Sequence, residues 1–452
     1  MMKKTLCWIA LVFSGTLLAI CDETESLQRE IDDVSSRGGG CVTVPAGRHR
    51  VGSLLLKSNV ELHLAKGAVL VGRDDRDGYS VFRPRYSEGE MFGMVMAHGV
   101  TNIAVTGDGV IDGKGGKWAH LSTFGSDTEG LRPRGLVFWE CKDIRIEDIS
   151  LVDAACWGCV FQCCDGVVVR RMKIDCHAIG NNDGFDIEAK NVLIENCDVD
   201  TGDDAYVLKS NDRDFIVENV IVRNCIGRST SNVFKLGTAS HGTMRNVRFE
   251  NCRSEACRRS FCNADGKDWF ASYRKKCWPG ASDGNMSLSA IAVECVDGGV
   301  VSNIVFKEIV VKDCLVPIFV RGGIRQRRGC GIPRNDKNVL RDIRIEDVTA
   351  SADSYVASSI TGVRGCRPAD VVLRNVHVHC KGGGDTRAEM DRPVPEVEGE
   401  YPESRMFKCM LPAYGLYVRH VDGIVLEDVV FAVQADQWDS RPAIVYDDVS
   451  PN

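Results

Sequence analysis

One short pattern recurs along most of this 452-residue chain and constrains its fold more than any other feature. Each copy holds two or three alternating apolar residues, many of them β-branched, then a polar residue and a second short apolar step. Most copies lie 23 to 28 residues apart, and the larger gaps indicate one coil skipped or enlarged. The nine copies are centred on Ile146, Val169, Ile194, Val222, Phe249, Phe306, Ile345, Leu373 and Leu426.

This spacing predicts a solenoid of short strands. No helical period lasts long enough to supply crossover helices, which argues against a doubly wound sheet or a (β/α) barrel. A pair of β-sandwiches would need hairpin turns roughly every 8 to 12 residues, and the sequence lacks them. We therefore predict an all-β parallel β-helix, in which each turn bonds to the next and equivalent positions stack about 4.8 Å apart.

The 21 cysteines follow the repeat rather than a disulfide or zinc pattern. Cys197, Cys225 and Cys252 each follow an asparagine, 28 and 27 residues apart. We interpret them as small buried apolar side chains, and we expect the Asn–Cys steps to form internal ladders at a bend. Disulfide bonds between some of the cysteines remain an alternative. No paired Cys-x-x-Cys spacing supports a structural metal site.

The N-terminus has the layout of a secretory signal: two lysines, an apolar run, then Cys21 and a polar segment. Residues 1–21 are predicted to be a signal peptide, and both simple secretion and a lipid anchor at Cys21 stay open. We expect an exported protein that is periplasmic, secreted or lipid-anchored at the cell surface. The apolar run is short for a bilayer span, and no later run is long enough.

The rest, residues 22–452, is predicted to be a single β-helix domain with insertions near 260–287 and 381–412. A net charge of −7 and a pI near 5.8 argue against nucleic acid as the main partner. Nothing in the sequence indicates oligomerisation, so we expect a monomer.

Two acidic clusters lie one predicted coil apart in residues 181–210, "NNDGFDIEAKNVLIENCDVDTGDDAYVLKS". Asp183 precedes one strand, and Asp203 and Asp204 take the corresponding place 20 and 21 residues later. Three carboxylates should therefore meet on the outer wall, and their repulsion should raise at least one pKa. Glycosidic cleavage needs such an acid and base, roughly 6.5–9.5 Å apart in inverting enzymes, which one coil and a diagonal step could supply. Plain Asn, Asp and Gly turns remain the alternative.

Longer motifs add a resemblance. The segments "GDGVIDGKGGKW", "NNDGFDI", "TGDDAYVLKS" and "DGGVVSNIVFKEI" together resemble glycoside hydrolase family 28, the polygalacturonase family of right-handed parallel β-helices, over about residues 40 to 430. The resemblance implies inverting hydrolysis of a pectic poly- or oligosaccharide, with no metal and no organic cofactor. It implies that Asp203 is the general acid and that Asp183 and Asp204 position and deprotonate water.

The same resemblance implies that Asp186 supports the cluster and that Lys209 contacts the sugar, although Lys209 could also simply balance the local charge. The chain departs from the family pattern in two places. Asn232 stands where the family has a histidine, and His241 lies further on, either in the site by another path or in a loop.

The second departure is the Arg-Ile-Lys triplet, replaced here by Ala292, Val293 and Glu294. The resemblance implies that this triplet holds a galacturonate carboxylate, and a glutamate in its place would repel an acidic sugar. Arg321 and Arg325, in "VRGGIRQRRG", either hold a uronate instead or belong to a solvated basic loop. These losses favour a divergent pectic or rhamnogalacturonan-type hydrolase, or an exo-acting enzyme.

Two other functions stay open. A polysaccharide lyase on the same architecture would commonly need Ca²⁺ and a cationic base. A catalytically silent glycan-binding β-helix protein would have lost the histidine and the basic triplet together.

Overall fold

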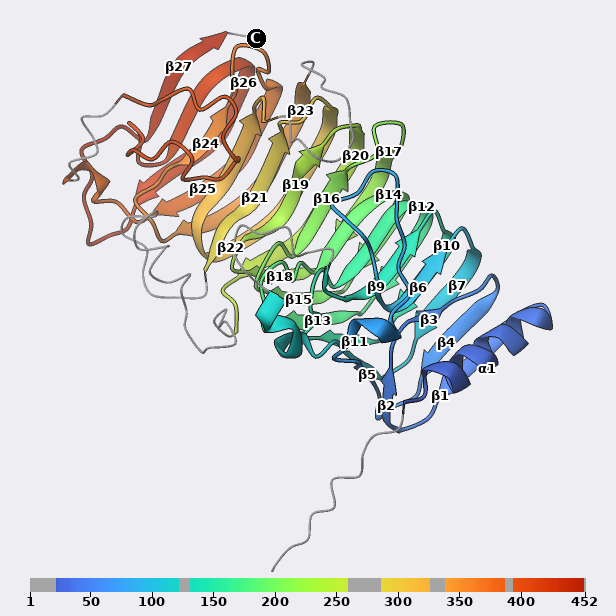
Figure 1. Ribbon diagram of the computed structural model, residues 1–452. Coiled ribbons are helices and arrows are strands. Elements are labelled where there is room, and N and C mark those ends of the chain that lie inside the picture. Colours follow the sequence, from blue (N-terminus) through green and yellow to red (C-terminus); the bar gives the residue numbers. More distant parts are fainter. Residues whose placement is uncertain (1–21, 122–130, 259–285, 326–337, 387–392, 451–452) are drawn as a thin grey trace, which may run out of the picture.

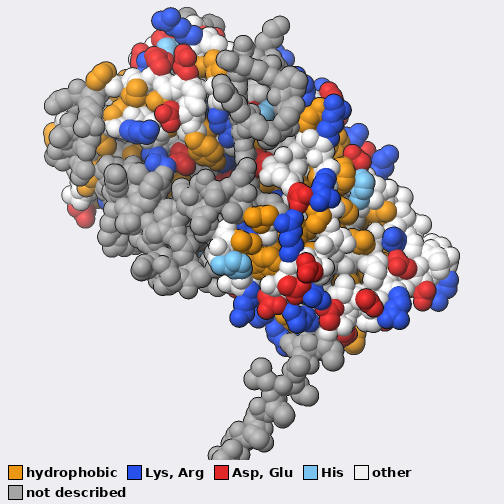
Figure 2. All heavy atoms as spheres, in the orientation of Figure 1, with side chains coloured by type: hydrophobic (Ala, Val, Ile, Leu, Met, Phe, Trp, Pro, Cys, Tyr) orange, Lys and Arg blue, Asp and Glu red, His pale blue; other side chains and the backbone are white. Residues whose placement is uncertain are grey.

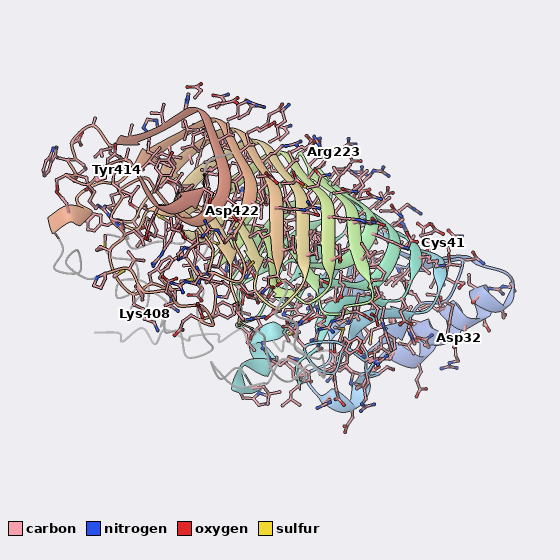
Figure 3. All side chains as sticks on the ribbon, turned by 90° about the horizontal axis from the view of Figure 1, so that it is seen from above. Asp32, Cys41, Arg223, Lys408, Tyr414 and Asp422 are labelled. Atoms are coloured by element: carbon pink, nitrogen blue, oxygen red, sulfur yellow. The ribbon has the colours of Figure 1, made fainter. Side chains whose placement is uncertain are left out.

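In a computed structural model, the described residues 22–121, 131–258, 286–325, 338–386 and 393–450 form one long stack of parallel strands (Figure 1). The strands fall into three ladders that run along the axis. Most coils contribute a separate strand to each ladder, and in some coils one long strand bends so that its two halves belong to different ladders. Seen from above, the strands lie one behind another from the end that carries Asp32 toward the end that carries Asp422 (Figure 3).

Ladder 1 opens each coil. Its strands are β1 (Gly40–Val44), β4 (Val60–Leu64), β7 (Thr101–Thr106), β10 (Lys142–Glu147), the second halves of β12 (Cys159–Arg170) and β14 (Phe185–Glu195), β17 (Ile216–Arg223), β20 (Thr243–Glu255), the first half of β22 (Val300–Gly322), β23 (Val339–Ala352), β25 (Ala369–Cys380) and the second half of β26 (Leu416–Val433).

Ladder 2 follows it. Its strands are β2 (Gly47–Val51), β5 (Ala68–Gly72), β8 (Val110–Asp112), β11 (Ser150–Val152), β13 (Lys173–Cys176), β15 (Asp198–Thr201) and β18 (Ile226–Ser229), which pairs with the end of β20.

Ladder 3 completes the coil and carries the candidate site. Its strands are β3 (Leu54–Leu55), β6 (Gly93–His98), β9 (Arg134–Trp139), the first halves of β12 and β14, β16 (Tyr206–Ser210), β19 (Asn232–Ser240), β21 (Ser287–Cys295), the second half of β22, β24 (Ser358–Thr361), the first half of β26 and β27 (Ile444–Ser450). Short 3₁₀ helices η1 (Arg76–Gly78), η2 (Gly115–Leu121) and η4 (Gly384–Thr386) lie in the connections.

The predicted right-handed parallel β-helix is confirmed. All nine predicted repeat centres are direct partners in ladder 1, from Ile146 opposite Val169 to Leu373 opposite Leu426. Phe249 pairs directly with Phe306, so the long gap between them is an enlarged coil rather than a skipped one.

Stacked apolar side chains fill the interior. Along ladder 3 the rings of Phe185, Tyr206 and Phe234 follow one another with centroids 5.6 Å apart. Phe249 and Phe306 stack at 5.0 Å. Such pairs contribute about 0.5–1.5 kcal/mol each beyond their buried area. Because side chains alternate along a strand, the residues directly before and after each of these inward-pointing rings in the sequence point outward.

The Asn–Cys steps divide between inside and outside. Cys197, Cys225 and Cys252 are buried, unpaired thiols, as predicted. The asparagines, however, do not form the expected internal ladder: Asn251 donates to Asn224 at 2.7 Å on the exposed surface. Both asparagines have a left-handed backbone, with φ near +50° to +55°, which turns the chain and points the amide outward.

A helix that the repeat pattern did not predict covers the first coil. Helix α1 (Thr24–Ser36) buries Leu27 and Ile31 against the end of the stack. The amide of Gln28 donates to the Leu55 carbonyl at 3.0 Å and accepts from the Leu55 N–H at 2.7 Å. A side chain thus takes the place of a neighbouring strand at β3.

Several sequence-based expectations fall wholly or partly outside the described residues. The signal peptide 1–21, with Cys21, is outside, and so is nearly all of the insertion at 260–287. Of the insertion at 381–412, the described residues hold η4 and no strand between β25 and β26. Among the described residues, no helix combines the length and apolar character needed to cross a bilayer. On the face in Figure 2, acidic and basic side chains lie interspersed.

Candidate functional site

The two acidic clusters meet at the turn that leads into ladder 3. The register of β14 and β16 places Asp183 and Asp204 at equivalent positions on neighbouring coils. One oxygen each from Asp183, Asp203 and Asp204 lies within 4.8 Å of the other two. These nearest oxygens are closer than the roughly 6.5–9.5 Å predicted between the carboxyl groups of an inverting pair, since Asp203 and Asp204 are consecutive residues and Asp183 lies on the neighbouring coil, about 4.8 Å away.

Hydrogen bonds from neighbouring residues fix the backbone of this turn. The hydroxyls of Thr201 and Ser229 each donate to the Asp203 carbonyl at 2.7 Å. The Asp204 N–H donates to the Asp203 carboxylate at 2.9 Å. The Asp203 carboxyl is half-buried, whereas Asp183 and Asp204 are buried. The turn therefore presents three carboxyl groups from a fixed frame.

Asp204 is paired on both oxygens. Lys235 contacts its Oδ2 at 2.9 Å, and Asn232 donates to its Oδ1 through its side chain at 2.9 Å and its backbone at 3.0 Å. Burial alone would raise the pKa of Asp204, but the Lys235 ammonium and these hydrogen bonds outweigh it and lower the pKa. Asn232, at the family's histidine position, thus holds Asp204.

Asp203 has the opposite shift. Burial, followed by repulsion from Asp183 and Asp204, raises the pKa of Asp203 well above its ordinary value. Burial also raises the pKa of Asp183, partly offset by Lys209. Adjacent carboxyl groups with pKa values displaced in opposite directions can hold one proton between them at neutral pH.

Lys209 and Asp186 form the next layer, on the outward face of β16 and β14. The Lys209 ammonium lies 2.6 Å from Asp186 and 3.4 Å from Asp183. It also lies 3.9 Å from the centre of the Trp157 ring. Its donors are therefore engaged by protein groups, and Lys209 neutralises the inner carboxylates.

The remaining predicted residues form no hydrogen bond or ion pair with the three carboxylates in the described part of the chain. His241 follows β19 at its other end, with Nε2 4.0 Å from Asp297, and burial lowers its pKa. Arg325 forms a two-point ion pair with the same Asp297.

Arg321 differs from the expectation of a basic loop. It lies in β22, buried, and donates to the carbonyls of Gly362, Glu396 and Val397 at 3.0 to 3.1 Å. It therefore anchors the segment between β25 and β26 on ladder 3 rather than facing a ligand.

Sequence reasoning missed Lys235, although a signal was present. The triplets Phe185-Asp186-Ile187, Tyr206-Val207-Leu208 and Phe234-Lys235-Leu236 are in direct register, with the middle residue outward. Aligning these three copies places Lys235 on the same face as Asp186, one coil beyond Asp204.

Arg134 and Trp157 were also missed. The register places Arg134, Trp157, Asp183, Asp204 and Asn232 at one turn position on five successive coils. The Arg134 guanidinium lies 4.5 Å from the Trp157 ring centre and donates to the Glu90 carbonyl at 3.1 Å. Its Nε and Nη2 are buried and have no partner among the described residues.

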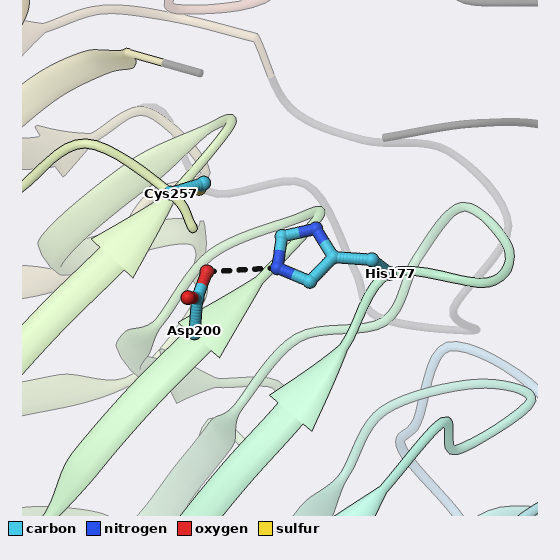
Figure 4. Close-up of side chains that lie close together, drawn as sticks. All are labelled: His177, Asp200 and Cys257. Carbon is cyan, nitrogen blue, oxygen red and sulfur yellow. Dashed lines mark hydrogen bonds and ion pairs between the residues drawn. The ribbon is translucent and has the colours of Figure 1, made fainter. Parts of the chain in front are cut away.

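Among the described residues, two groups of side chains have the composition of metal sites. In the first, Asp183, Asp203 and Asp204, the Lys235 ammonium already sits on Asp204 where a cation would bind. The second is His177, Asp200 and Cys257 (Figure 4). There Asp200 accepts from His177 at 2.8 Å and from the Arg258 N–H at 3.1 Å. Because both Asp200 oxygens are taken, this group stabilises the end of β15, from which the chain turns toward Asp203.

Comparisons with known proteins identify the family and the fold. A sequence model described as "Glycosyl hydrolases family 28" matches residues 41–259 and 291–395. A probable polygalacturonase of Vitis vinifera is 27% identical over 247 residues, which are 50% of this chain and 50% of that protein. A probable rhamnogalacturonase A of Aspergillus oryzae is 25% identical over 199 residues, 44% of this chain and 39% of that protein.

The chain thus spans about half the length or less of these curated relatives. Among solved structures, an exopolygalacturonase from Thermotoga maritima superposes with a TM-score of 0.63 and 22% identity, covering 90% of this chain and 88% of that one. That likeness supports the fold.

Proposed function

Because the chain belongs to the glycosyl hydrolases of family 28, we propose that it hydrolyses a glycosidic bond in a pectic poly- or oligosaccharide. The observation that carries this proposal is the opposed pKa shift of two adjacent carboxyl groups, Asp203 and Asp204, beside Asp183. Acid–base hydrolysis needs one group protonated and another ionised at the same pH.

Asp203 is the general acid in this proposal. Its raised pKa keeps a proton available for the leaving glycosidic oxygen. Asp204 stays ionised beside Lys235, and together with Asp183 it orients a water molecule and takes its proton. The proton given by Asp203 and the proton taken by the base balance over one turnover. We propose inversion at the anomeric carbon, as the resemblance implies.

We propose that the part of the substrate facing the coils N-terminal to the carboxylate cluster carries an acidic sugar. Two donor atoms of Arg134 have no hydrogen-bond partner among the described residues, and its guanidinium lies against Trp157, which stands one coil before Asp183. A guanidinium can bind a uronate carboxylate through two parallel hydrogen bonds. In this proposal Arg134, rather than Arg321 or Arg325, faces the uronate.

The test is Asp203→Asn, assayed on a panel of pectic oligosaccharides with the products followed by NMR. Loss of one acid–base group should lower kcat by about 10³-fold, within the range of 10²–10⁴ for such groups. The matched control is Asp214→Asn, the same change at an exposed residue before β17. Asp203→Asn that folds normally and keeps full activity would refute the assignment.

The same NMR experiment reads the stereochemistry and the alternative reaction. An inverting hydrolase gives a product whose first-formed anomer is opposite to that of the substrate bond. A lyase instead gives an unsaturated sugar that absorbs near-ultraviolet light, and a chelator should inhibit its formation. Binding without turnover across the panel would favour the glycan-binding alternative.

A further inference from the structure

His177, Asp200 and Cys257 bring three kinds of metal-binding atom together inside the molecule (Figure 4). They come from three different coils: His177 directly follows β13, Asp200 lies in β15, and Cys257 lies two residues after β20. One donor atom from each side chain, an imidazole nitrogen, a carboxylate oxygen and a thiol sulfur, lies within 4.8 Å of the other two. Nitrogen, oxygen and sulfur donors are the set that Zn²⁺ uses in proteins.

All three side chains are buried: His177 is 2% exposed, Asp200 0% and Cys257 5%. Polar groups this deep normally each have a partner. Here the hydrogen bonds satisfy only part of the group, because His177 Nδ1 is buried with no hydrogen-bond partner among the described residues. An imidazole carries its proton on either nitrogen, so the ring can hold the proton at Nδ1 and offer Nε2, which faces Asp200, to a cation.

Asp200 keeps the capacity to bind a cation. Its Oδ1 accepts one hydrogen from His177 at 2.8 Å, and its Oδ2 accepts one from the Arg258 N–H at 3.1 Å. A carboxylate oxygen has two lone pairs, so an oxygen that accepts one hydrogen can also bind an ion. Burial would raise the pKa of Asp200, but the His177 ring and Arg258 outweigh it and lower the pKa, so the carboxyl group stays ionised.

The charges of the three donors balance a divalent cation. The Asp200 carboxylate and a Cys257 thiolate carry two negative charges between them, and the neutral imidazole adds none. A bound Zn²⁺ would leave the buried group without net charge, which removes the main cost of placing an ion there. The Arg258 guanidinium does not take this place, because its side chain is 52% exposed and pairs with Asp198.

The separations of the donors are those of a site for a small ion. Ligand atoms about 2.0–2.3 Å from a tetrahedral zinc ion are roughly 3.3–3.6 Å from one another. His177 Nε2 and Asp200 Oδ1 are 2.8 Å apart, and the donor atoms of the group lie within 4.8 Å of one another. Side-chain rotations that move these atoms by about 1 Å would bring all three to ligand distance. The Cys257 sulfur, 3.6 Å from the Thr201 carbonyl, would exchange that weak contact for the ion.

We propose that His177, Asp200 and Cys257 bind one Zn²⁺ ion, with water as the fourth ligand, and that the ion fixes the start of the turn that carries the carboxylate cluster. Binding converts the Cys257 thiol to a thiolate and releases its proton to solvent, and no electron is transferred. Asp200 stands three residues before Asp203, and the Thr201 hydroxyl between them donates to the Asp203 carbonyl. The role of the ion is therefore structural, and this inference does not rest on the proposed function.

The test uses the full chain produced in medium supplemented with Zn²⁺ or Co²⁺, because a site this deep fills as the chain folds. Elemental analysis gives the metal content, and a thiolate-to-cobalt charge-transfer band reports a sulfur ligand. Zinc affinity is measured by competition with a chelator of known affinity. The variants are Cys257→Ser and His177→Gln. Cys252→Ser, at another buried thiol, is the matched control.

The wild type should hold one zinc ion per chain, and the cobalt protein should show the charge-transfer band. Cys257→Ser should lose the band and bind zinc about 10²-fold more weakly or worse, since losing even a group that only supports a ligand costs about 10–100-fold. Cys252→Ser should keep both properties. Removal of the ion by a chelator should lower the unfolding midpoint of the wild type and of Cys252→Ser, and leave that of Cys257→Ser unchanged.

Equal metal content and equal spectra in the wild type and in Cys257→Ser would overturn the inference, whether both proteins bind metal or neither does. If Cys257→Ser fails to fold, His177→Gln decides in its place, since wild-type zinc affinity in that variant would also contradict the site. None of these measurements uses turnover, so failure of this site and failure of the proposed function are distinguishable.

Discussion

The outward surface of ladder 3 has two stretches that differ in almost every side chain. We call them the charged face, from β14 to β19, and the covered face, from β21 onward. From β14 to β19 the outward positions hold Asp186, Lys209 and Lys235, beside the carboxylates of the turn. From β21 onward, Ala292, Phe319 and Tyr417 occupy the outward positions in direct register. The segment between β25 and β26 covers this second face with Met406, Phe407 and Leu411.

The comparison shows that the scaffold permits chemistry without specifying it. Both faces stand on the same parallel ladder, so the difference comes mainly from which side chains stand outward and whether another segment covers them. The charged face and the covered face meet between Lys235 and Ala292, which are direct register partners on the neighbouring strands β19 and β21. Variants on either side of that boundary should therefore fail in different ways.

Among the variants that test this boundary, Lys235→Met on the charged face should have the largest effect. Without the ammonium, burial would raise the pKa of Asp204, which must be ionised to act as base. We expect kcat to fall by about 10²-fold or more, and the acid limb of the pH–rate profile to move to higher pH. Lys173→Met, at an exposed position on β13, is the control. An unmoved acid limb would mean that Lys235 does not set Asp204.

Phe407→Ala tests the covered face. Phe407 is buried against Tyr417 with ring centroids 6.4 Å apart, and its truncation should lower the free energy of unfolding by about 3 kcal/mol. Urea denaturation measures the loss, and Trp438→Ala, at a 71% exposed aromatic, is the control with little expected change. If kcat fell as far as it does for Lys235→Met, the boundary between the two faces would not hold.

The smallest effect is expected far from both faces, at the exposed asparagine ladder. Asn224→Ala forces alanine into a left-handed backbone and removes the bond from Asn251, so it should destabilise by about 1–2 kcal/mol without changing activity. Asn224→Gly keeps the backbone conformation and loses only the bond. Equal unfolding midpoints for the two variants would show that backbone strain contributes nothing here.

The fold could be predicted because its signal is local and repeated. Each repeat centre, such as Ile146 between Arg145 and Glu147, is an apolar residue in a short strand, and the coil length sets which residues stack. The asparagine ladder was placed on the wrong side because sequence does not show the sign of φ at Asn224 and Asn251. Helix α1 was missed because it occurs once, before the repeat begins.

The site was predictable to the extent that it follows the coil length. The meeting of Asp183 with Asp203 and Asp204 follows from a separation of one coil. The partners of these carboxylates needed a further step, because Lys235 is recognised only when the outward positions of successive coils are aligned, as in Phe185-Asp186-Ile187 and Phe234-Lys235-Leu236. The arginines of "VRGGIRQRRG" misled because their number suggested a ligand, whereas Arg321 and Arg325 are taken by backbone carbonyls and by Asp297.

The contact between Gln28 and Leu55 has a consequence for how the molecule behaves in a concentrated solution. A solenoid ends in an edge strand, and an edge strand with free N–H and C=O groups invites a second chain to extend it. By bonding both backbone groups of Leu55, the Gln28 amide closes part of that edge. Chains lacking residues 22–36 should therefore associate end to end into fibres.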